Sequence, residues 1–298
     1  MIVLVTGGAG FIGSHTVDLL IKQKHTVIVI DNESAQANSK FYWDDRAANY
    51  KLDIRDYDSI RHLFNGVDYV IHLAAQARIQ PSLLNPSETI ESNVIGTANV
   101  LRCAREAGVK RVVFSSSSSV YGNGPLPNKE GNELDPLNPY AVSKVVGEDL
   151  CKMYNSLGLE TIMLRYFNVY GPRQPDKGPY ATVLGKFQSQ IKKGYAVTVV
   201  GDGSQKRDFT YVEDVARANV EAAFKFQKPE NLGKPYNVGT GHNYSMNEIA
   251  KMLGTKKTRV DKRPAESQET LADLKNTGRT IGWNAVNYLE TYLKKLKT

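Results

Sequence analysis

The chain has 298 residues, of which 41% are hydrophobic and 23% are charged, and its net charge is +7. These values predict a soluble globular protein, either one large α/β domain or a domain with a smaller lobe. The positive residues are scattered, so we expect no nucleic-acid partner. No apolar stretch approaches the roughly 20 residues that are needed to cross a membrane. Cys103 and Cys151 lack a metal-ligand spacing, so we expect reduced thiols, no metal site and a cytoplasmic location.

Short β-branched runs alternate with helical patterns over the first part of the chain. Strands are expected at 2–6, 26–30, 50–52, 69–73, 112–115 and 161–165, and helices at 11–23, 57–63, 86–107 and 139–157. Strands separated by segments of helix length predict a parallel, doubly wound sheet of the Rossmann type with right-handed crossovers.

The alternation stops after about Asn168, where loops with glycine and proline separate shorter elements. These loops contain Gly171-Pro172, Gly178-Pro179 and Gly201-Asp202-Gly203. We therefore expect an α/β protein in two parts. Residues 1–168 would form an NAD-binding Rossmann domain. Residues 169–298 would form mainly a smaller, mixed α/β lobe for the substrate, with room for crossings that return to the sheet.

A glycine-rich turn, Gly7-Gly8-Ala9-Gly10-Phe11-Ile12-Gly13, follows the first expected strand and opens the first expected helix. Glycines there permit a tight turn and a close backbone approach to a pyrophosphate. Asp31 ends the second strand, where a carboxylate binds ribose hydroxyls and repels a 2′-phosphate, so NAD is favoured over NADP. Asp53-Ile54 follows the third strand, and Asp53 is placed either to hold the adenine or to cap the next helix.

Tyr140 and Lys144 stand four residues apart on the helix expected at 139–157, so their side chains are adjacent. An ammonium close to a phenol favours the phenolate and lowers a pKa that is ordinarily about 10. Such a tyrosine can take a proton from a sugar or alcohol hydroxyl. Ser117 lies in a run of five serines, which the flanking apolar residues indicate to be a strand end and turn. Beside a dinucleotide site, these residues predict redox chemistry at a hydroxyl-bearing carbon.

Taken in order, these motifs resemble the extended short-chain dehydrogenase/reductase superfamily, specifically NAD-dependent nucleotide-sugar epimerases of the UDP-glucose 4-epimerase kind. The resemblance covers essentially the whole chain. Its landmarks are Thr6–Gly13, His72–Ala75, Ser115–Ser117 before Val120–Gly122, Tyr140 with Lys144, Arg165–Arg173, Gly201–Gly203, Arg207–Val212, and Arg263–Glu266 ahead of Ala272–Lys275.

The resemblance implies NAD as cofactor, a UDP-sugar as substrate, and a homodimer paired through the 86–107 and 139–157 helices. It implies that Tyr140 is the base, that Ser117 binds the C4 oxygen, and that Lys144 bridges the nicotinamide ribose and lowers the pKa of Tyr140. The cofactor-binding residues that it implies are Gly7, Gly10, Phe11, Ile12, Gly13, Asp31, Asn32, Asp53, Ile54, Leu73, Ala74, Ala75, Asn93, Ser115, Tyr140 and Lys144. The substrate-binding residues that it implies are Ser117, Asn168, Arg207, Arg263, Glu266 and Thr270.

Asn168, Arg207 and Arg263 would hold the diphosphate of the UDP-sugar, a role that suits guanidinium groups because their geometry matches phosphate oxygens. The chain departs from the family pattern at Ala265, where a glycine is usual, so this loop can differ. Dehydratases of the superfamily carry acidic residues directly after the catalytic Ser/Thr. Ser118 and Ser119 stand there in this chain, so we set elimination aside.

We therefore expect an isomerase that epimerises a UDP-hexose at C4 through a 4-keto intermediate. Thr270 falls where a bulky tyrosine restricts related pockets to glucose and galactose, so UDP-GlcNAc and UDP-GalNAc are expected substrates as well. Arg78 could instead bind a carboxylate, which keeps a UDP-glucuronate 4-epimerase, or another nucleotide-sugar oxidoreductase, as the alternative. A non-enzymatic NAD-binding module is disfavoured because Ser117, Tyr140 and Lys144 are all present.

Overall fold

The computed structural model describes residues 1–35, 38, 40–176, 181–225 and 228–296. The turn expected at Gly178-Pro179 lies outside these residues. Within them, no helix is long and apolar enough to span a lipid bilayer.

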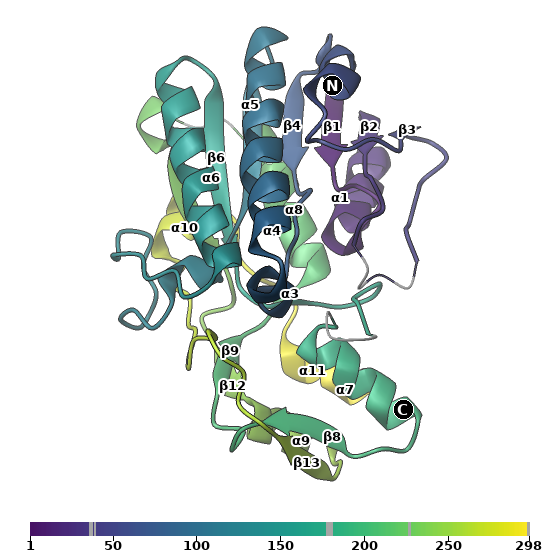
Figure 1. The fold of residues 1–298 in the computed structure, drawn as a ribbon, viewed down its shortest axis with the longest axis vertical. Helices are drawn as coiled ribbons and strands as arrows, with labels where there is room; N and C mark the ends of the chain where they lie inside the picture. Colours follow the sequence, from purple (N-terminus) through teal and green to yellow (C-terminus); the bar gives the residue numbers. More distant parts are fainter. Residues whose placement is uncertain (36–37, 39, 177–180, 226–227, 297–298) are drawn as a thin grey trace.

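A seven-stranded parallel sheet forms the larger part of the protein (Figure 1). Its strands are β1 (Ile2–Thr6), β2 (Thr26–Ile30), β3 (Ala48–Tyr50), β4 (Tyr69–His72), β5 (Arg111–Ser117), β6 (Glu160–Tyr166) and β11 (Lys234–Val238). They lie in the order β11-β6-β5-β4-β1-β2-β3. The direction of winding reverses between β1 and β4, and the carboxyl ends of the strands at such a point form a ligand-binding crevice. The predicted doubly wound sheet is confirmed.

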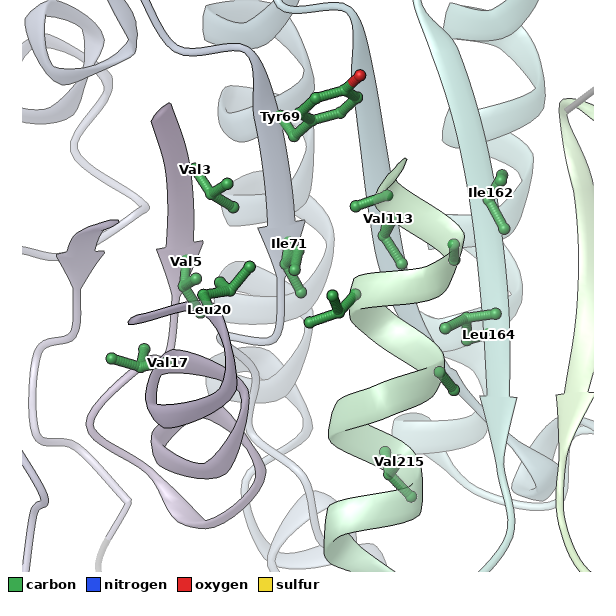
Figure 2. Close-up of a cluster of buried hydrophobic side chains, with 14 of the residues drawn as sticks. Val3, Val5, Val17, Leu20, Tyr69, Ile71, Val113, Ile162, Leu164 and Val215 are labelled. Atoms are coloured by element: carbon green, nitrogen blue, oxygen red, sulfur yellow. The ribbon is translucent and has the colours of Figure 1, made fainter. Parts of the chain in front are cut away.

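Helices cover both faces of this sheet, because alternate residues of each buried strand point to opposite sides. On one face lie α1 (Phe11–Lys22) and α8 (Val212–Phe224), and the other face carries α2 (Tyr57–Ile60), α5 (Gly96–Glu106) and α6 (Pro139–Ser156). Figure 2 shows the first of these cores, where Val3, Val5, Ile71, Val113 and Leu164 of the sheet lie beside Val17, Leu20 and Val215 of the two helices. The two cores together fix the carboxyl edge of the sheet.

The smaller part of the fold is built from short strands and helices with a core of their own, which includes Leu184, Phe187, Val197 and Ile249. The strand pairs are β7 (Val169–Tyr170) with β10 (Thr210–Tyr211), β8 (Val197–Val200) with β13 (Lys257–Val260), and antiparallel β9 (Lys206–Asp208) with β12 (Asn243–Ser245). The helices are α7 (Val183–Lys192), α9 (Met246–Leu253) and α11 (Leu289–Lys295), whereas α10 (Lys275–Thr280) packs against β11 at the edge of the large sheet. The smaller mixed α/β part is thus confirmed, whereas its assignment to the substrate stays a prediction.

Chain segments from both sides of residue 168 build the large sheet. Strand β11 pairs in parallel with β6 at one edge, and Val215 and Ala218 of α8 pack into the core beneath the sheet. The chain therefore crosses back to the Rossmann part after it has entered the smaller part.

Several elements differ in extent from the sequence expectation. Strand β3 lies two residues before the expected 50–52, at the exposed sheet edge, where no burial pattern marks its bounds. Helix α3 (Ile79–Leu84) was not expected, and it accommodates Pro81 in its first turn, where no backbone donor is needed. The helix expected at 86–107 consists of α4 (Pro86–Ile90), a π-helical turn (Glu91–Ile95) and α5. Short 3₁₀ turns occupy Arg61–Phe64, Ser118–Tyr121 and Pro229–Asn231.

Candidate active site

A cavity of about 680 Å³ opens at the carboxyl ends of the parallel strands, against residues of the smaller part. It is lined by residues that follow β1, β2, β4, β5 and β6, and also by residues of the loops around β9 and β13. All of the expected site residues line this cavity except Asp53 and Asn93. Residues from nearly the whole length of the chain therefore meet in one space.

The glycine turn forms one end of the cavity, and its glycines are sterically required. A Cβ atom on Gly13 would lie 2.0 Å from the carbonyl oxygen of Gly7, and one on Gly7 would lie 2.7 Å from the backbone nitrogen of Ala74. No side chain caps α1 at Gly10, so the first-turn amide groups stay available for an anion.

Asp31 lies beside this turn and is buried. Its carboxylate accepts hydrogen bonds from the backbone amides of Ala9 (3.1 Å) and Glu33 (2.8 Å). Burial raises the pKa of Asp31, and these hydrogen bonds oppose the increase. The carboxylate is therefore fixed at the end of β2, where a ribose would meet it.

Asp53 is held by its neighbours and does not itself line the cavity. Hydrogen bonds from Arg55 (2.7 Å) and Asn32 (2.9 Å) reach its carboxylate, and those from Arg55 lead the effects that lower the pKa of Asp53 to about 2. The alternative that Asp53 caps the next helix is wrong, because Asp56 caps α2 by accepting from Ser59. The adjacent Ile54 does line the cavity.

Asn93 lies behind the residues that line the cavity and binds one of them. Its amide nitrogen donates to the Gln76 carbonyl (3.0 Å) and to the Ser143 hydroxyl (2.9 Å), while its oxygen accepts from the Gln76 amide (2.7 Å). Asn93 lies in the π-helical turn, a local widening that is frequent at functional sites. It therefore fixes the cavity-lining segment around Gln76 against α6.

Tyr140, Ser117 and Lys144 meet at the middle of the cavity wall. Asn138 caps α6 by accepting from Ala141, and the Tyr140 amide donates to the Ser82 hydroxyl (3.2 Å), which fixes the first turn of the helix. The Ser117 side chain influences Tyr140, since it lowers the pKa of the Tyr140 phenol. The Lys144 ammonium donates to the Ser115 carbonyl (2.7 Å) and lies 5.8 Å from the centre of the Tyr140 ring.

The electrostatics around Tyr140 correct one expectation. Burial raises the pKa of Tyr140, and the effects that oppose this increase come from the Ser117 side chain and the charge of Arg78. Lys144 is not among the groups that lower the pKa of Tyr140. Burial lowers the pKa of Lys144 itself to about 8. In the chain without ligands, desolvation of the phenolate outweighs the nearby positive charges.

A buried ion pair supports α6 beyond Lys144. The Glu148 carboxylate lies 2.6 Å from the guanidinium of Arg165 on β6, and their side chains are 0% and 2% exposed. Ser116 donates to Glu148 (2.6 Å), and Arg165 donates to the Tyr121 hydroxyl (2.9 Å). The pair therefore fixes the serine strand, the helix and the turn after Ser117 relative to one another.

The other end of the cavity is assembled from loops of the smaller part. Asn168 has a positive φ of 26°, and its amide donates to the Asp208 carbonyl (2.9 Å) and the Thr270 hydroxyl (3.3 Å). Arg207 donates to the carbonyls of Lys206, Ser267 and Gln268. Three of its five N–H groups are thus used, and two remain for a ligand.

Arg263 and Arg207 face the same carboxylate, that of Glu266, at 3.9 and 4.0 Å. Two guanidinium groups opposite one carboxylate leave a surplus of positive charge, which suits a diphosphate. Ala265, which lies between Arg263 and Glu266 in the sequence, has φ +59°, a conformation that a glycine would adopt freely. Its carbonyl accepts a hydrogen bond from the Asn138 amide group (3.0 Å). The loop therefore keeps its left-handed turn without the glycine that is usual in the family.

Sequence reasoning missed some residues that line the cavity. Thr182 lines the cavity and caps α7, because its hydroxyl accepts a hydrogen bond from the Gly185 amide (3.0 Å). A threonine before an apolar run is a signal for the start of a helix, so the sequence could have indicated this residue. Phe41 also lines the cavity. It carried no signal, because its place depends on the path of the long loop after Asp31.

A doubly wound sheet with a glycine turn, an acidic residue after β2 and a serine, tyrosine and lysine at the sheet edge defines the short-chain dehydrogenase/reductase class. Within this class, the chain belongs to the NAD dependent epimerase/dehydratase family, whose family model matches residues 3–239.

Relatives with different named substrates resemble the chain to a similar degree. The UDP-glucose 4-epimerase of Thermotoga maritima, solved with UDP-glucose, is 35% identical over 99% of this chain and 96% of its own, with a TM-score of 0.90. The UDP-N-acetylglucosamine 4-epimerase of Methanobrevibacter ruminantium, solved with UDP-N-acetylmuramic acid, is 34% identical over 99% and 95%, with a TM-score of 0.89. The UDP-glucuronate 4-epimerase of Thermodesulfobacterium geofontis is 34% identical over 98% and 94%. Overall similarity therefore does not select a sugar.

NAD is the cofactor of this family, and the residues present fit it. The uncapped first turn of α1 offers amide groups to a pyrophosphate, and the glycines leave room beside it. The Asp31 carboxylate can accept hydrogen bonds from ribose hydroxyls. Nicotinamide would then lie toward Ser115, Tyr140 and Lys144 on the cavity wall.

Proposed function

We propose that the protein catalyses NAD-dependent C4 epimerisation of a UDP-hexose through a 4-keto intermediate. The observation that carries this proposal is the placement of Ser117, Tyr140 and Lys144 in one cavity, between the glycine turn and the end that holds Arg207 and Arg263. Ser118 and Ser119 also line the cavity, and neither offers a carboxylate for elimination. Reversible oxidation at a carbinol therefore suits the site better than loss of water.

In this mechanism Tyr140 takes the proton of the sugar O4, and Ser117 donates a hydrogen bond to the same oxygen. When bound, NAD supplies the acceptor for the C4 hydride and returns the hydride to the opposite face of the ketone. Asn168, Arg207 and Arg263 keep the diphosphate in place while the keto sugar turns over between the two transfers. Tyr140 then gives the proton back to O4, so each cycle leaves the enzyme unchanged.

A proton NMR assay of UDP-Gal, UDP-GalNAc and UDP-GlcA, without added cofactor, tests the reaction. We expect the C4 epimer to appear for at least one of these sugars with the wild-type protein. Tyr140→Phe should abolish turnover while NAD binding and thermal stability stay unchanged. Activity of this variant near the wild-type level would remove Tyr140 from the proposed role.

Thr270 supports a pocket that also accepts N-acetyl sugars. Its hydroxyl accepts hydrogen bonds from Asn168 (3.3 Å) and from the Asp208 amide (3.3 Å), so this small side chain is fixed at the cavity wall. Thr270→Tyr should remove turnover of UDP-GlcNAc and UDP-GalNAc and spare UDP-Glc and UDP-Gal. Failure of the wild-type protein to convert the N-acetyl pair would contradict this substrate range.

A second candidate is 4-epimerisation of UDP-glucuronate, and Arg78 is the observation in its favour. Arg78 lines the cavity, and among the described residues no group accepts a hydrogen bond from its guanidinium or forms an ion pair with it. An arginine of this kind could bind a sugar carboxylate. The UDP-GlcA arm of the NMR assay separates the two candidates, since a hexose epimerase without this activity leaves UDP-GlcA unchanged.

We also propose that the protein forms a homodimer through α4, α5 and α6. In Figure 1, α4 and α5 follow one another end to end, and α6 lies beside them. These helices and the π-helical turn carry exposed apolar side chains, among them Ile90, Ile95, Val142 and Met153. A second copy would cover them and form a four-helix bundle. Sedimentation velocity should give a dimer for the wild type and a monomer for Ile95→Glu with Val142→Glu, and a monomeric wild type would contradict the proposal.

A further inference from the structure

His72 is a buried histidine that the proposed mechanism does not use. It ends β4, and the chain that follows it, residues 73–76, lines the cavity. Both nitrogens of its imidazole have partners, because Nδ1 lies 2.6 Å from the Thr6 hydroxyl and Nε2 lies 2.9 Å from the Thr97 hydroxyl. Thr6 ends β1, directly before the glycine turn, and Thr97 lies in α5. The imidazole therefore joins the end of the first strand to a helix that covers the sheet.

Thr6 fixes the first part of segment 73–76. Its hydroxyl oxygen accepts a hydrogen bond from the Ala74 amide (3.3 Å). Ala74 packs directly on the glycine turn, since a Cβ atom on Gly7 would lie 2.7 Å from the Ala74 backbone nitrogen. One side of the imidazole is therefore linked to the backbone against which the cofactor is expected.

Thr97 fixes the end of the same segment through Asn93. The Thr97 hydroxyl donates to the Asn93 carbonyl (2.6 Å). The Asn93 side chain bonds in turn to the backbone of Gln76 and to the Ser143 hydroxyl. Ser143 donates to the Tyr140 carbonyl (2.7 Å). A path of buried side chains therefore leads from Thr97 both to the cavity wall and to the first turn of α6.

These contacts determine which nitrogen of His72 carries the proton. A carbonyl can only accept, so the single hydroxyl proton of Thr97 points to Asn93, and Nε2 must donate to the Thr97 oxygen. Burial, together with the charge of Lys144, lowers the pKa of His72 to about 3, so the imidazole is neutral and holds one proton. Nδ1 is then an acceptor, and the Thr6 hydroxyl donates to it.

We propose that His72, held in its Nε2–H tautomer, is a positioning residue that fixes segment 73–76 and Tyr140 relative to each other. His72 itself is not among the residues that line the cavity, so it acts through the two anchors that it connects. This inference rests on the proposed function, because it takes Tyr140 as the base and segment 73–76 as a wall of the cofactor site. A displacement of about 1 Å between reacting groups can cost about 100-fold in rate. The expected effect of His72 is therefore on kcat.

Two-dimensional proton–nitrogen NMR of the holoenzyme with isotope-labelled histidine tests the tautomer without turnover. The chemical shifts distinguish a protonated from an unprotonated imidazole nitrogen. Among the five histidines of the chain, the His72 signals are those that His72→Gln lacks or, if this variant does not fold, those that Thr97→Ser shifts. We expect a protonated Nε2 and an unprotonated Nδ1 from about pH 6 to about pH 8. The opposite tautomer, or a titration in this range, would overturn the inference.

Thr97→Val breaks the connection at one bond while it keeps the shape of the side chain. The Nε2–H group and the Asn93 carbonyl each lose their partner, so we expect kcat to fall about tenfold or more and the KM for the UDP-sugar to stay within about twofold. Thr97→Ser keeps the hydroxyl and should stay within about twofold of the wild-type kcat. Thr161→Val is the matched control, since the buried Thr161 hydroxyl also donates to a helix carbonyl, that of Cys151 (2.8 Å). Its kcat should match the wild type.

A double variant tests whether His72 joins the two threonines. Thr6→Val removes the partner of Nδ1, and Thr6→Val with Thr97→Val removes both partners of the imidazole. Because the first substitution already releases the imidazole, the combined loss of kcat should be clearly smaller than the product of the two single losses. Losses that multiply would show that the threonines act independently, and they would overturn the inference.

The remaining outcomes also decide the question. Equal losses of stability in Thr97→Val and Thr161→Val, with kcat unchanged in both, would make His72 a structural residue only. A raised KM with an unchanged kcat would mean that its contacts shape substrate binding instead of the reacting geometry. A wild-type protein without turnover, or an active Tyr140→Phe variant, would contradict the proposed function, and the NMR measurement would still support or overturn the assigned tautomer.

Discussion

The two ends of the cavity are built in opposite ways. The cofactor end depends on one continuous turn, Gly7–Gly13, and on Asp31 at the end of the next strand. The other end depends on Asn168, Arg207 and Thr270, which are far apart in the sequence and are brought together around the buried Asp208. One end is therefore specified by local sterics and the other by long-range hydrogen bonds.

Because of this difference, a substitution should disrupt each end of the cavity in a different way. A turn whose glycines face backbone atoms fails by steric conflict, and its failure stays local. A set of loops held by one carboxylate fails when that carboxylate loses its hydrogen bonds, and the loss spreads to every loop attached to it. Substitutions at the two ends should therefore affect cofactor and substrate binding separately.

The largest expected effect comes from Gly13→Ala, which should break the cofactor end. The new Cβ would lie 2.0 Å from the Gly7 carbonyl and 2.7 Å from the Gly8 Cα, both backbone atoms that cannot move aside cheaply. We expect the free energy of unfolding to fall by about 3 kcal/mol and NAD binding to be lost in a fluorescence titration. Gly131→Ala is the control, because nothing lies within 4 Å of its Cβ position. Equal behaviour of the two variants would contradict the steric argument.

Asp208→Asn should weaken the opposite end alone. The Asp208 carboxylate accepts from the Thr240 amide (2.8 Å) and hydroxyl (2.6 Å), the Gly241 amide (2.9 Å) and the Ala272 amide (3.1 Å). In Asp208→Asn the new NH2 group would face backbone amides that also donate, so hydrogen bonds would be lost. We expect the free energy of unfolding to fall by about 2 kcal/mol and the KM for the UDP-sugar to rise at least tenfold.

The Kd for NAD is the measurement that separates the two ends in this variant, and it should stay within about twofold of the wild type. Asp202→Asn is the matched control, since Asp202 is exposed and, within the described part of the chain, its carboxylate accepts only from the amide and the hydroxyl of Ser204. A parallel loss of NAD affinity in Asp208→Asn would show that the two ends are coupled after all.

A change of pH should also distinguish the ends. Burial raises the pKa of Asp31, so this carboxylate takes up a proton at a higher pH than an ordinary aspartate, whereas the guanidiniums of Arg207 and Arg263 stay charged. NAD affinity should therefore fall as the pH falls through the raised pKa, by about tenfold per unit, while binding of UDP should change little. In Asp31→Asn the NAD affinity should be weak and independent of pH, and a wild-type slope in this variant would assign the titration elsewhere.

The smallest expected effect concerns the loop between Arg263 and Glu266. Ala265 adopts φ +59°, which is unfavourable for a side chain, although a glycine there costs extra entropy in the unfolded chain. Ala265→Gly should therefore raise the free energy of unfolding by less than about 1 kcal/mol and change KM by less than about twofold. Chemical denaturation and steady-state kinetics check both values, and a clear loss of stability would show that the methyl group makes favourable contacts.

The sequence predicted best what adjacent residues determine. The glycine turn, the strands at 2–6 and 26–30, and the start of α6 depend on local sterics, periodicity and caps, and all were found within a residue of their expected places. It predicted less well what distant residues determine. The charge of Arg78 on Tyr140, the engagement of Asp53 by Arg55, and the link from Asn93 to Gln76 arise only when separate segments meet. The family motifs placed Asn168, Arg207, Arg263 and Thr270 at the cavity, which no local pattern could have done.

The buried pair of Glu148 and Arg165 has a consequence for how this family can change its sequence. Loss of either residue alone leaves a charge in the core and costs about 3–5 kcal/mol, whereas joint replacement by apolar residues of similar volume is often neutral. A lineage can therefore leave this arrangement only by changing both positions together. We expect the two positions to covary among relatives, either as an acid with an arginine or as two uncharged residues, and the helix that carries Tyr140 inherits that constraint.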